Sequence, residues 1–290
     1  MKKMTYFFVA LAASAGSAHG MELTPLPQLF PILQDGRNGY VNEAGQMVIE
    51  PRFDESGTFS WGLAPAKVGT LWGYINKKGE VSILPKFDEA TAFSEGLAAV
   101  KTGGKWAYLD PTGETVIPPQ FDEAGQFSEG LAAVKVDLDW GYIDPTGETV
   151  IPPQFSEGGI FSGGLAAVRI GQMWSYVDPS GQTVIDRYFE EARPFSQGFA
   201  PVKINGRWSY IDKSGKVVYQ IFEDAAPFSE GLAAVKVGGK WGYINAKGEI
   251  AVNVQFDEAS SFVRGMACVS LAGKWAYIDR TGNFVSNAAR

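Results

Sequence analysis

Five pairs of adjacent acidic residues recur along the chain, and a pair of carboxyl groups is what a glycoside hydrolase uses to cleave a sugar bond. The pairs are Asp54–Glu55, Asp88–Glu89, Asp122–Glu123, Glu190–Glu191 and Asp257–Glu258. The reaction requires one site whose two carboxyl groups differ in environment and therefore in pKa. Five near-copies in near-identical settings do not supply that asymmetry. We therefore expect these carboxylates to be solvated groups that help to form turns.

The chain holds one histidine and one cysteine, which limits the other chemistries that it could perform. His19 falls within a predicted signal peptide, so a mature chain that begins after Gly20 would have no histidine and could form no Ser–His–Asp triad, no Cys–His dyad and no His-ligated zinc site. The acidic residues also lack the spacing of an EF-hand loop. Cys268 has no partner for an internal disulfide, and we expect a small buried side chain there. The sequence thus predicts no catalytic residue, no metal site and no cofactor.

The first twenty residues differ from the rest of the chain. They read MKKMTYFFVALAASAGSAHG, with two lysines, a short apolar run and then small residues. This pattern is typical of a signal peptide, with cleavage after Ala18 or Gly20; a buried N-terminal helix is the alternative. No other stretch approaches the length of apolar residues that spans a bilayer. We therefore expect a signal peptide over residues 1–20, a lead-in over residues 21–28, no integral membrane segment in the mature chain, and export to the periplasm or the extracellular space.

The charge balance excludes one large class of partner. Removing Lys2 and Lys3 with the signal peptide leaves 23 basic residues against 32 acidic ones, a net charge of −9. An acidic surface repels the phosphate backbone, so nucleic acid is not an expected partner. Docking on anionic lipid is disfavoured for the same reason.

The elements that must position any functional group belong to a repeat of about 34 residues. Tryptophans recur at steps of 34, 34, 34, 34, 33 and 34 residues, at Trp72, Trp106, Trp140, Trp174, Trp208, Trp241 and Trp275. A tyrosine follows each one two positions later, and a glycine follows five positions after that. Asn38 stands where one more unit would carry its tryptophan, with Tyr40 and Gly45 in register. The array therefore has eight units and covers residues 29–290.

The sequence of each repeat unit predicts three short β-strands. In one unit they are LAAVKV (131–136), WGYID (140–144) and TVIP (149–152), separated by turns rich in Gly, Pro and Asp. Proline presets φ early in such a turn, and Gly147 reaches a positive φ without strain. A period of 34 also suggests helical repeats, but no run of ten residues has helical periodicity. We expect the two phenylalanines of each linker, such as Phe121 and Phe127, to pack between neighbouring units.

The strands are apolar on both faces, which predicts how the units assemble. Trp140 and Tyr142 point to one face of their strand and Ile143 points to the other. A small antiparallel sheet that is apolar on both sides must stack on its neighbours. We therefore predict an all-β tandem array of eight three-stranded antiparallel units in a propeller-like stack, with an open β-superhelix or solenoid as the alternative. The tryptophans would then form a core ladder, although aromatic rows can also stack on sugars.

The repeat resembles the bacterial WG-repeat family. The residues that carry the resemblance are FSEGLAAVKVGGK (228–240) and KWGYINAKGE (240–249), and similar motifs cover residues 29–286. The resemblance implies β-rich modules of surface, secreted and signalling proteins, without a general enzymatic role and with no catalytic residues to carry over. Departures from the motif are Asn38 in the first unit and Ala or Ser in place of the second letter of Trp-Gly, at Ala107, Ser175, Ser209 and Ala276.

Binding residues are sought where the repeat is broken, because Trp, Tyr and Arg carry much of the energy of protein interfaces. Trp61 and Arg264 replace the glutamate of FSEG, and Asp186-Arg187-Tyr188 replaces Pro-Pro-Gln. Arg193 and Tyr219 lie in comparable parts of the same and the next unit. The candidate binding residues are Trp61, Arg187, Tyr188, Arg193, Tyr219 and Arg264. Neutral variation between units explains the same differences.

These observations predict an exported, non-enzymatic interaction scaffold. Its rigid β-repeat array would present loops to a protein or to a polymer of the cell envelope. Two alternatives remain: a carbohydrate-binding repeat protein that uses Trp and Tyr platforms, and a glycosidase that uses two of the carboxylates.

Overall fold

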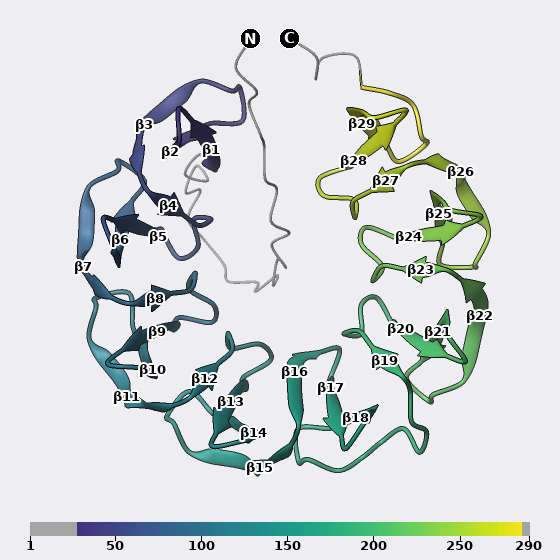
Figure 1. Cartoon of the computed structure of the whole chain (residues 1–290), viewed down its shortest axis with the longest axis horizontal. Coiled ribbons are helices and arrows are strands. Elements are labelled where there is room, and N and C mark those ends of the chain that lie inside the picture. Colours follow the sequence, from purple (N-terminus) through teal and green to yellow (C-terminus); the bar gives the residue numbers. More distant parts are fainter. Residues whose placement is uncertain (1–27, 286–290) are drawn as a thin grey trace, which may run out of the picture. The chain divides into compact units, whose positions relative to one another are not determined.

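The computed structural model describes residues 28–285, which form 29 strands and no helix. The predicted signal peptide (1–20) and nearly all of the lead-in (21–28) lie outside the described residues. The strands form eight small antiparallel sheets (Figure 1), and the chain divides into two units. The first unit comprises Met1–Asp137 and Ile143–Thr149, and the second comprises Leu138–Tyr142 and Val150–Arg290.

The first unit contains three complete sheets and the start of a fourth. They are β1 (Phe30–Gln34), β2 (Arg37–Val41) and β3 (Met47–Phe53); β4 (Glu55–Ser56), β5 (Leu63–Val68), β6 (Leu71–Asn76) and β7 (Val81–Phe87); β8 (Glu89–Ala90), β9 (Ala98–Thr102), β10 (Lys105–Leu109) and β11 (Thr115–Phe121); then β12 (Glu123–Ala124) and β13 (Ala132–Val136). Hairpins join the longer strands, and the register is regular: Trp106 lies opposite Lys101 and Tyr108 opposite Ala99.

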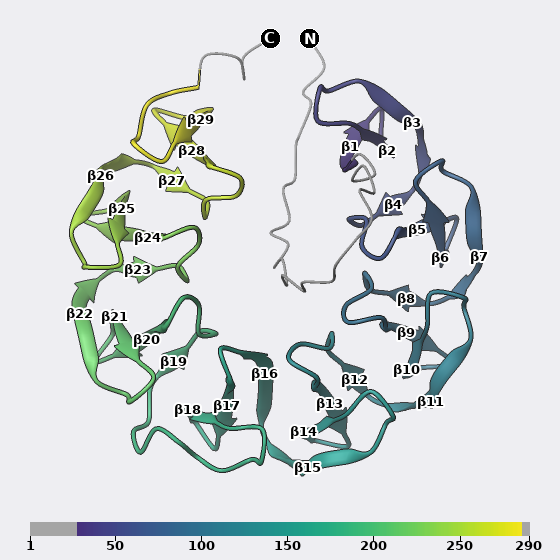
Figure 2. The same ribbon diagram turned by 180° about the vertical axis from the view of Figure 1, so that it is seen from behind.

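The second unit holds the rest. It has all but one residue each of β14 (Asp139–Ile143) and β15 (Thr149–Phe155), the other strands of the fourth sheet. Its further sheets are formed by β16 (Glu157–Ser162), β17 (Leu165–Ile170) and β18 (Met173–Val177); β19 (Glu191–Ala192), β20 (Phe199–Ile204), β21 (Arg207–Asp212) and β22 (Val217–Phe222); β23 (Asp224–Ala225), β24 (Leu232–Val237), β25 (Lys240–Asn245) and β26 (Ile250–Phe256); β27 (Glu258–Ala259), β28 (Met266–Leu271) and β29 (Lys274–Asp279). Within each unit the third strands, such as β7 and β22, run along the outer side, and the loops that precede β5 or β24 extend to the inner side (Figures 1 and 2).

Consecutive sheets stack through apolar clusters that use both faces of the middle strand. Tyr108 of β10 packs with Phe127 of the following linker, with ring centroids 5.0 Å apart. Its neighbour Leu109 is buried in the preceding cluster, together with Tyr74 of β6. Phe121 also packs against Tyr108. The predicted stacking and the predicted role of the phenylalanines are therefore confirmed, and the all-β array has the propeller-like architecture expected from the sequence.

The repeated tyrosine also ties each sheet to the next by a hydrogen bond. The hydroxyl donates to a backbone carbonyl 16 or 17 residues later, as from Tyr108 to Gly125 at 2.7 Å and from Tyr176 to Arg193 at 2.8 Å. Burial raises the pKa of Tyr40 to about 12 and raises that of Tyr108 and Tyr176 still further, because the charged form would lose its hydration. These hydroxyls therefore stay protonated and keep donating at neutral pH.

Gly73, the second letter of one Trp-Gly pair, has a steric reason that the sequence alone did not give, although other units carry Ala or Ser at this position. The third strand bulges where it crosses the middle strand: Trp72 pairs with Phe87, but Tyr74 pairs with Ile83. A Cβ on Gly73 would lie only 2.5 Å from the carbonyl oxygen of Ile83. The backbone of the third strand thus passes directly over this glycine.

The linker contains a strand that was not predicted. Each repeat has its first two predicted strands, and in five of the eight sheets a two-residue strand such as β12 or β23 adds a fourth at the edge. The third strand of the fifth sheet is interrupted: residues 183–189 keep only the bridges Val177–Thr183 and Trp174–Phe189. The interruption coincides with Asp186-Arg187-Tyr188, the segment that breaks the repeat in the sequence.

Candidate binding surfaces

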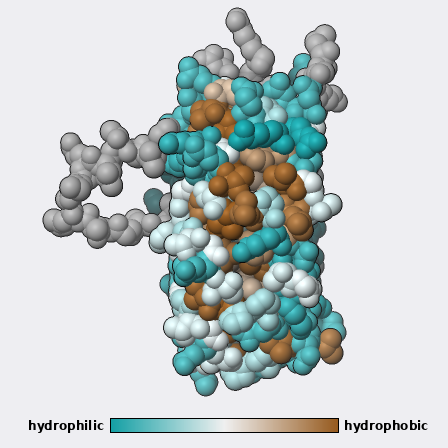
Figure 3. All heavy atoms as spheres, turned by 90° about the vertical axis from the view of Figure 1, so that its left-hand side faces the viewer, coloured by the Kyte–Doolittle hydropathy of each residue, from teal (hydrophilic) through white to brown (hydrophobic). Residues whose placement is uncertain are grey.

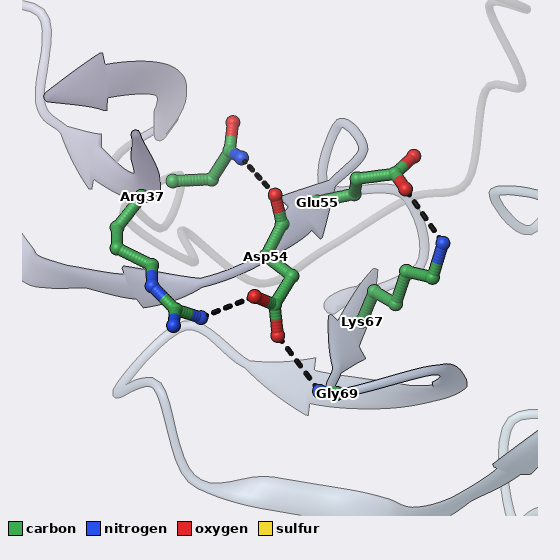
Figure 4. Close-up of polar contacts among 6 residues, drawn as sticks. Arg37, Asp54, Glu55, Lys67 and Gly69 are labelled. Carbon is green, nitrogen blue, oxygen red and sulfur yellow. Dashed lines mark hydrogen bonds and ion pairs between the residues drawn. The ribbon is translucent and has the colours of Figure 1, made fainter. Parts of the chain in front are cut away.

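The paired carboxylates hold the sheets in place. Asp54 accepts a hydrogen bond from the backbone N–H of Gly69 at 2.7 Å and forms an ion pair with Arg37, while Glu55 forms an ion pair with Lys67 at 2.6 Å (Figure 4). The first acid thus caps the turn between β5 and β6 and reaches back to β2, and the second joins β4 to β5. Both oxygens of Asp54 have partners in the fold.

The same arrangement recurs in other sheets. Asp122 pairs with Lys105 and accepts the N–H of Asp137, and the hydrogen bond from Lys105 is the main reason that the pKa of Asp122 is lowered. Glu123 pairs with Lys135 at 2.7 Å. Over residues 28–285, no group of three or more His, Cys, Asp or Glu side chains is arranged to hold a metal ion. These acidic pairs therefore link neighbouring strands through ion pairs and backbone hydrogen bonds. This role is more specific than that of the solvated turn residues that we expected.

Most of the tryptophan ladder is packed between strands and sheets. Trp106 and Trp208 are buried, and Trp72, Trp140, Trp174 and Trp241 are half-buried. Lysine ammonium groups lie over several of the rings, as Lys101 does over Trp106 with 5.8 Å to the centroid. Among the tryptophans of the described residues, only Trp61, with 62% of its surface exposed, and Trp275, with 58%, are largely open to solvent. The ladder thus offers little free indole surface for a row of sugars.

Two of the candidate binding residues are engaged inside the fold. The guanidinium of Arg193 lies 4.0 Å from the ring centroid of Trp208, donates to the carbonyl of Ala225 at 2.5 Å and pairs with Asp224 at 2.9 Å. The hydroxyl of Tyr219 donates to the carbonyl of Ala246. Both side chains bridge neighbouring sheets of the second unit, which accounts for their place in the sequence without a ligand.

Two other candidates lie on the outer side of the second unit. Arg187 and Tyr188 occupy the interrupted third strand, where 53% of the Tyr188 surface is exposed and the Arg187 guanidinium lies 5.8 Å from the ring of Phe189. Ser175 lies beneath this segment and donates to the carbonyl of Ile185 at 3.1 Å. Arg187 and Tyr188 are thus held on a supported loop, on the side opposite to the FSEG turns.

Trp61 of the first unit and Arg264 of the second occupy equivalent positions of the repeat, each in a two-residue hairpin turn. We use turn row for the set of these equivalent turns along the sequence, 61–62, 95–96, 129–130, 163–164, 197–198, 230–231 and 264–265. Both residues of each turn have positive φ, 55° at Trp61 and 81° at Gly62, and the flanking residues pair as Ser60 does with Leu63. A left-handed conformation costs about 1 kcal/mol or more for a residue with a side chain. The repeat therefore accepts strain in order to place a side chain at the tip of every turn of the row except Gly163–Gly164. Most of these side chains are exposed, and Glu230 is half-buried.

In most turns this side chain binds the backbone of the next turn. Glu95 accepts hydrogen bonds from the N–H groups of Glu129 at 2.8 Å and Gly130 at 2.9 Å. Glu230 does the same for Arg264 at 2.5 Å and Gly265 at 2.8 Å. A pair of adjacent N–H groups forms a concave anion-binding nest, and the carboxylate of the preceding turn fills it. We call such turns closed.

From Glu95 onwards, two turns of the row receive no acceptor from the preceding turn, whereas Gly231 N–H binds the amide oxygen of Gln197 at 2.9 Å. Trp61 precedes the turn Glu95–Gly96 and brings an indole in place of the acid. Gly163 precedes the turn Gln197–Gly198 and has no side chain. The described part of the chain supplies no acceptor for the four N–H groups of these two turns. We call them open. Sequence reasoning missed them because it treated the glutamate of FSEG as a polar loop residue; the signal was the change from SEG to SGG at residues 162–164.

The remaining surface features are of two kinds. Figure 3 shows apolar side chains gathered on the outer side of the first unit, where Met47, Val48, Val81, Leu84 and Val116 of β3, β7 and β11 are exposed. Cys268 in β28 is only partly buried, where we expected a buried side chain, and this burial raises the pKa of its thiol. No helix of residues 28–285 is long and apolar enough to cross a bilayer.

The protein is a tandem β-repeat protein. Its small antiparallel sheets have apolar faces, stack in sequence order and are joined by hydrogen bonds of Tyr and Glu side chains. The family of WG containing repeat proteins matches seven segments, residues 39–70, 72–106, 107–137, 140–174, 174–208, 208–241 and 241–275. The chain belongs to this family, as the sequence motifs indicated. No curated protein matches the chain.

Several solved structures are similar in fold. Dihydro-heme d1 dehydrogenase NirN, in complex with DHE, matches with a TM-score of 0.60 and 13% identity over 94% of this chain and 75% of that one. A eukaryotic initiation factor matches with a TM-score of 0.53 and 12% identity over 90% and 95%. Hsv2 of Kluyveromyces marxianus matches with a TM-score of 0.52 and 10% identity over 81% and 96%. At these identities the likeness concerns the fold alone.

Proposed function

We propose that the chain is an exported, non-enzymatic binding protein whose turn row contacts a protein or a cell-envelope polymer, with Trp61 as the main anchor. The observation that carries the proposal is the state of Trp61. It is a large apolar side chain, 62% exposed, on a residue with φ of 55°. It also stands where other repeats carry a glutamate whose carboxylate binds the two N–H groups of the next turn. The chain therefore accepts strain and forgoes a fastening contact in order to expose an indole, a residue type enriched in interface hot spots.

Two further observations support the proposal. The acidic pairs whose contacts are described above are engaged in ion pairs and backbone hydrogen bonds, which leaves them poorly placed to serve as an acid and a nucleophile. Export is supported by the sequence of residues 1–20, with its two lysines, apolar run and small residues. Repeats that present a side chain at equivalent turns are suited to extended contact with a partner.

The experiment compares two surfaces of the immobilised protein. Trp61→Glu installs the residue that equivalent turns carry, so the fold should be retained while the anchor is lost. The double variant Arg187→Glu with Tyr188→Ala alters the outer side of the second unit and serves as the matched control. Wild type and both variants are exposed to cell-envelope extract and to purified wall and surface glycans, and the bound material is identified by mass spectrometry.

The outcomes separate the candidate functions. A protein or polymer retained by wild type and by the double variant, but lost with Trp61→Glu, supports binding through the turn row. Loss only with the double variant moves the contact to the outer side and contradicts the role of Trp61. Retention of glycan alone, competed by free sugar, favours a carbohydrate-binding protein instead.

A further inference from the structure

We infer that the open turn Gln197–Gly198, together with Lys213, is a binding site for a carboxylate group supplied by a ligand. The site lies in the second unit and does not include Trp61. The inference goes beyond the proposed function and is independent of it, because it depends on hydrogen-bond donors and charge at this turn alone.

The class of ligand follows from what the equivalent turns of other repeats bind. At Glu129–Gly130 and at Arg264–Gly265 the two N–H groups bind both oxygens of a glutamate from the preceding turn, at distances from 2.5 to 2.9 Å. Gln197 has φ of 52°, against 54° for Glu129. The backbone of the open turn thus has the conformation that holds a carboxylate in the closed ones.

The position of the missing carboxylate is unfilled because Gly163 has no side chain. Gly163 has φ of 66°, in the same left-handed region as Glu95 at 51°. A Cβ added there would meet nothing closer than 3.4 Å, the Cε atom of Lys213. A side chain at this position would therefore fit in ordinary van der Waals contact with Lys213 and Phe195. No described residue supplies an acceptor to Gln197 N–H or Gly198 N–H.

A positive charge stands beside this place. The Lys213 ammonium nitrogen lies 3.5 Å from the position of that added Cβ, and the described residues give it neither an ion pair nor a hydrogen bond. At the equivalent position of the last sheet, Arg280 donates to the carbonyl of Glu230. Among the described residues the adjacent Asp212 forms no ion pair with this ammonium; its Oδ1 atom accepts hydrogen bonds from Ser214 and from Lys216 N–H. The side chain missing at Gly163 thus leaves two N–H groups without a described acceptor, and the Lys213 ammonium lies beside its place.

The second open turn does not form the same site. At Glu95–Gly96 the indole of Trp61 reaches within 3.8 Å of the position that a Cβ on Gly96 would take, so the ring partly covers the turn. Pro111 stands at the position that corresponds to Lys213, so no cation is added there. The carboxylate site is therefore assigned to Gln197–Gly198 only.

The test follows the backbone amides of the full chain by ¹⁵N–¹H NMR while acetate replaces chloride at constant ionic strength. We expect the Gln197 and Gly198 resonances to move in a saturable way. The amides of Gly130 and Gly265 are internal controls that should stay in place, because Glu95 and Glu230 already occupy them. Lys213→Gln should weaken binding by about two- to five-fold, the range for one exposed charge pair. Absence of any response at Gln197 and Gly198, or an equal response at Gly130 and Gly265, would overturn the inference.

The second part of the test places a carboxylate within the chain itself, at position 163. Gly163→Glu should shift the Gln197 and Gly198 resonances without ligand and abolish their response to acetate, whereas Gly163→Ala should leave the response intact. The peptide acetyl-Gly-Glu-Gly-amide should bind and its Gln counterpart should not, while acetyl-Gly-Gly-Gly with a free carboxylate tests a chain terminus as the source. Inorganic phosphate that binds as tightly as acetate would contradict the assignment to carboxylates.

Discussion

Closed and open turns have the same backbone and differ in one side chain of the preceding repeat. At Glu129–Gly130 the fold fills its own anion nest with Glu95, and at Gln197–Gly198 Gly163 leaves the nest empty. The turn geometry is therefore a property of the repeat, whereas its occupancy is decided turn by turn. A repeat protein can thus create a ligand site by deleting one of its own fastening contacts, without any change of fold.

In both kinds of turn, the repeated tyrosine of the unit forms a hydrogen bond with the loop that leads to the turn. Tyr108 fixes the carbonyl of Gly125 ahead of a closed turn, and Tyr176 fixes that of Arg193 ahead of an open one. A closed turn thus has two anchors and an open turn has one. The following predictions test this difference.

Alkaline pH should remove the shared anchor and have the largest effect. Burial raises the pKa of Tyr40 from 10 to about 12. The neutral tyrosine is therefore favoured in the folded state, so its contribution is complete below about pH 10 and is lost as the pH rises through about 12. Two pKa units correspond to about 2.7 kcal/mol of unfolding free energy for this residue. Tyrosinate absorbance and circular dichroism should change together above pH 10, and ionisation of the buried tyrosines without unfolding would refute the shared anchor.

Removing single hydroxyls should separate the two kinds of turn. Tyr108→Phe and Tyr176→Phe each leave a carbonyl without its donor and should lower the free energy of unfolding by about 1–2 kcal/mol. The turn Gln197–Gly198 should lose order more than Glu129–Gly130, because only the latter retains a carboxylate. Denaturant unfolding gives the global change, and amide relaxation gives the local one. Equal loosening of both turns would show that Glu95 adds little.

Opening a closed turn should have a smaller effect. Glu230→Ala removes the acceptor of two N–H groups and should lower the free energy of unfolding by about 0.5–1.5 kcal/mol. Glu114→Ala is the matched control, because the Glu114 side chain has no hydrogen-bond or ion-pair partner among the described residues. Thermal unfolding of the two variants measures the difference, and an equal loss in both would remove the distinction between closed and open turns.

Closing an open turn should have the smallest effect, with the opposite sign. Trp61→Glu supplies an acceptor to Glu95–Gly96 and should raise the free energy of unfolding by about 0.5–1 kcal/mol, while Trp61→Gln should achieve less because its acceptor is uncharged. Differential scanning calorimetry can resolve the gain. A loss of stability with Trp61→Glu would mean that the indole itself supports the fold.

The sequence revealed the repeat, the order of the three main strands and the stacking of sheets, because the spacing of Trp, Tyr and Gly reports the backbone directly. It did not reveal the fourth strand, since a two-residue strand such as β12 has no periodicity. Nor did it give the role of Glu95, because its partners lie 34 and 35 residues away and adjoin it only once sheets stack. The candidates Arg193 and Tyr219 were visible as breaks in the repeat, but such breaks do not distinguish a contact within the fold from one with a ligand.

Amide hydrogen exchange of the free protein, measured residue by residue, tests the central claim most directly. The claim is that the turn row contains N–H pairs filled by the fold and pairs left for a ligand. We predict slow exchange at Gly130 and Gly265, whose N–H groups bind carboxylates, and fast exchange at Gly96 and Gly198, whose N–H groups do not. Equal exchange rates at the four glycines would contradict the account.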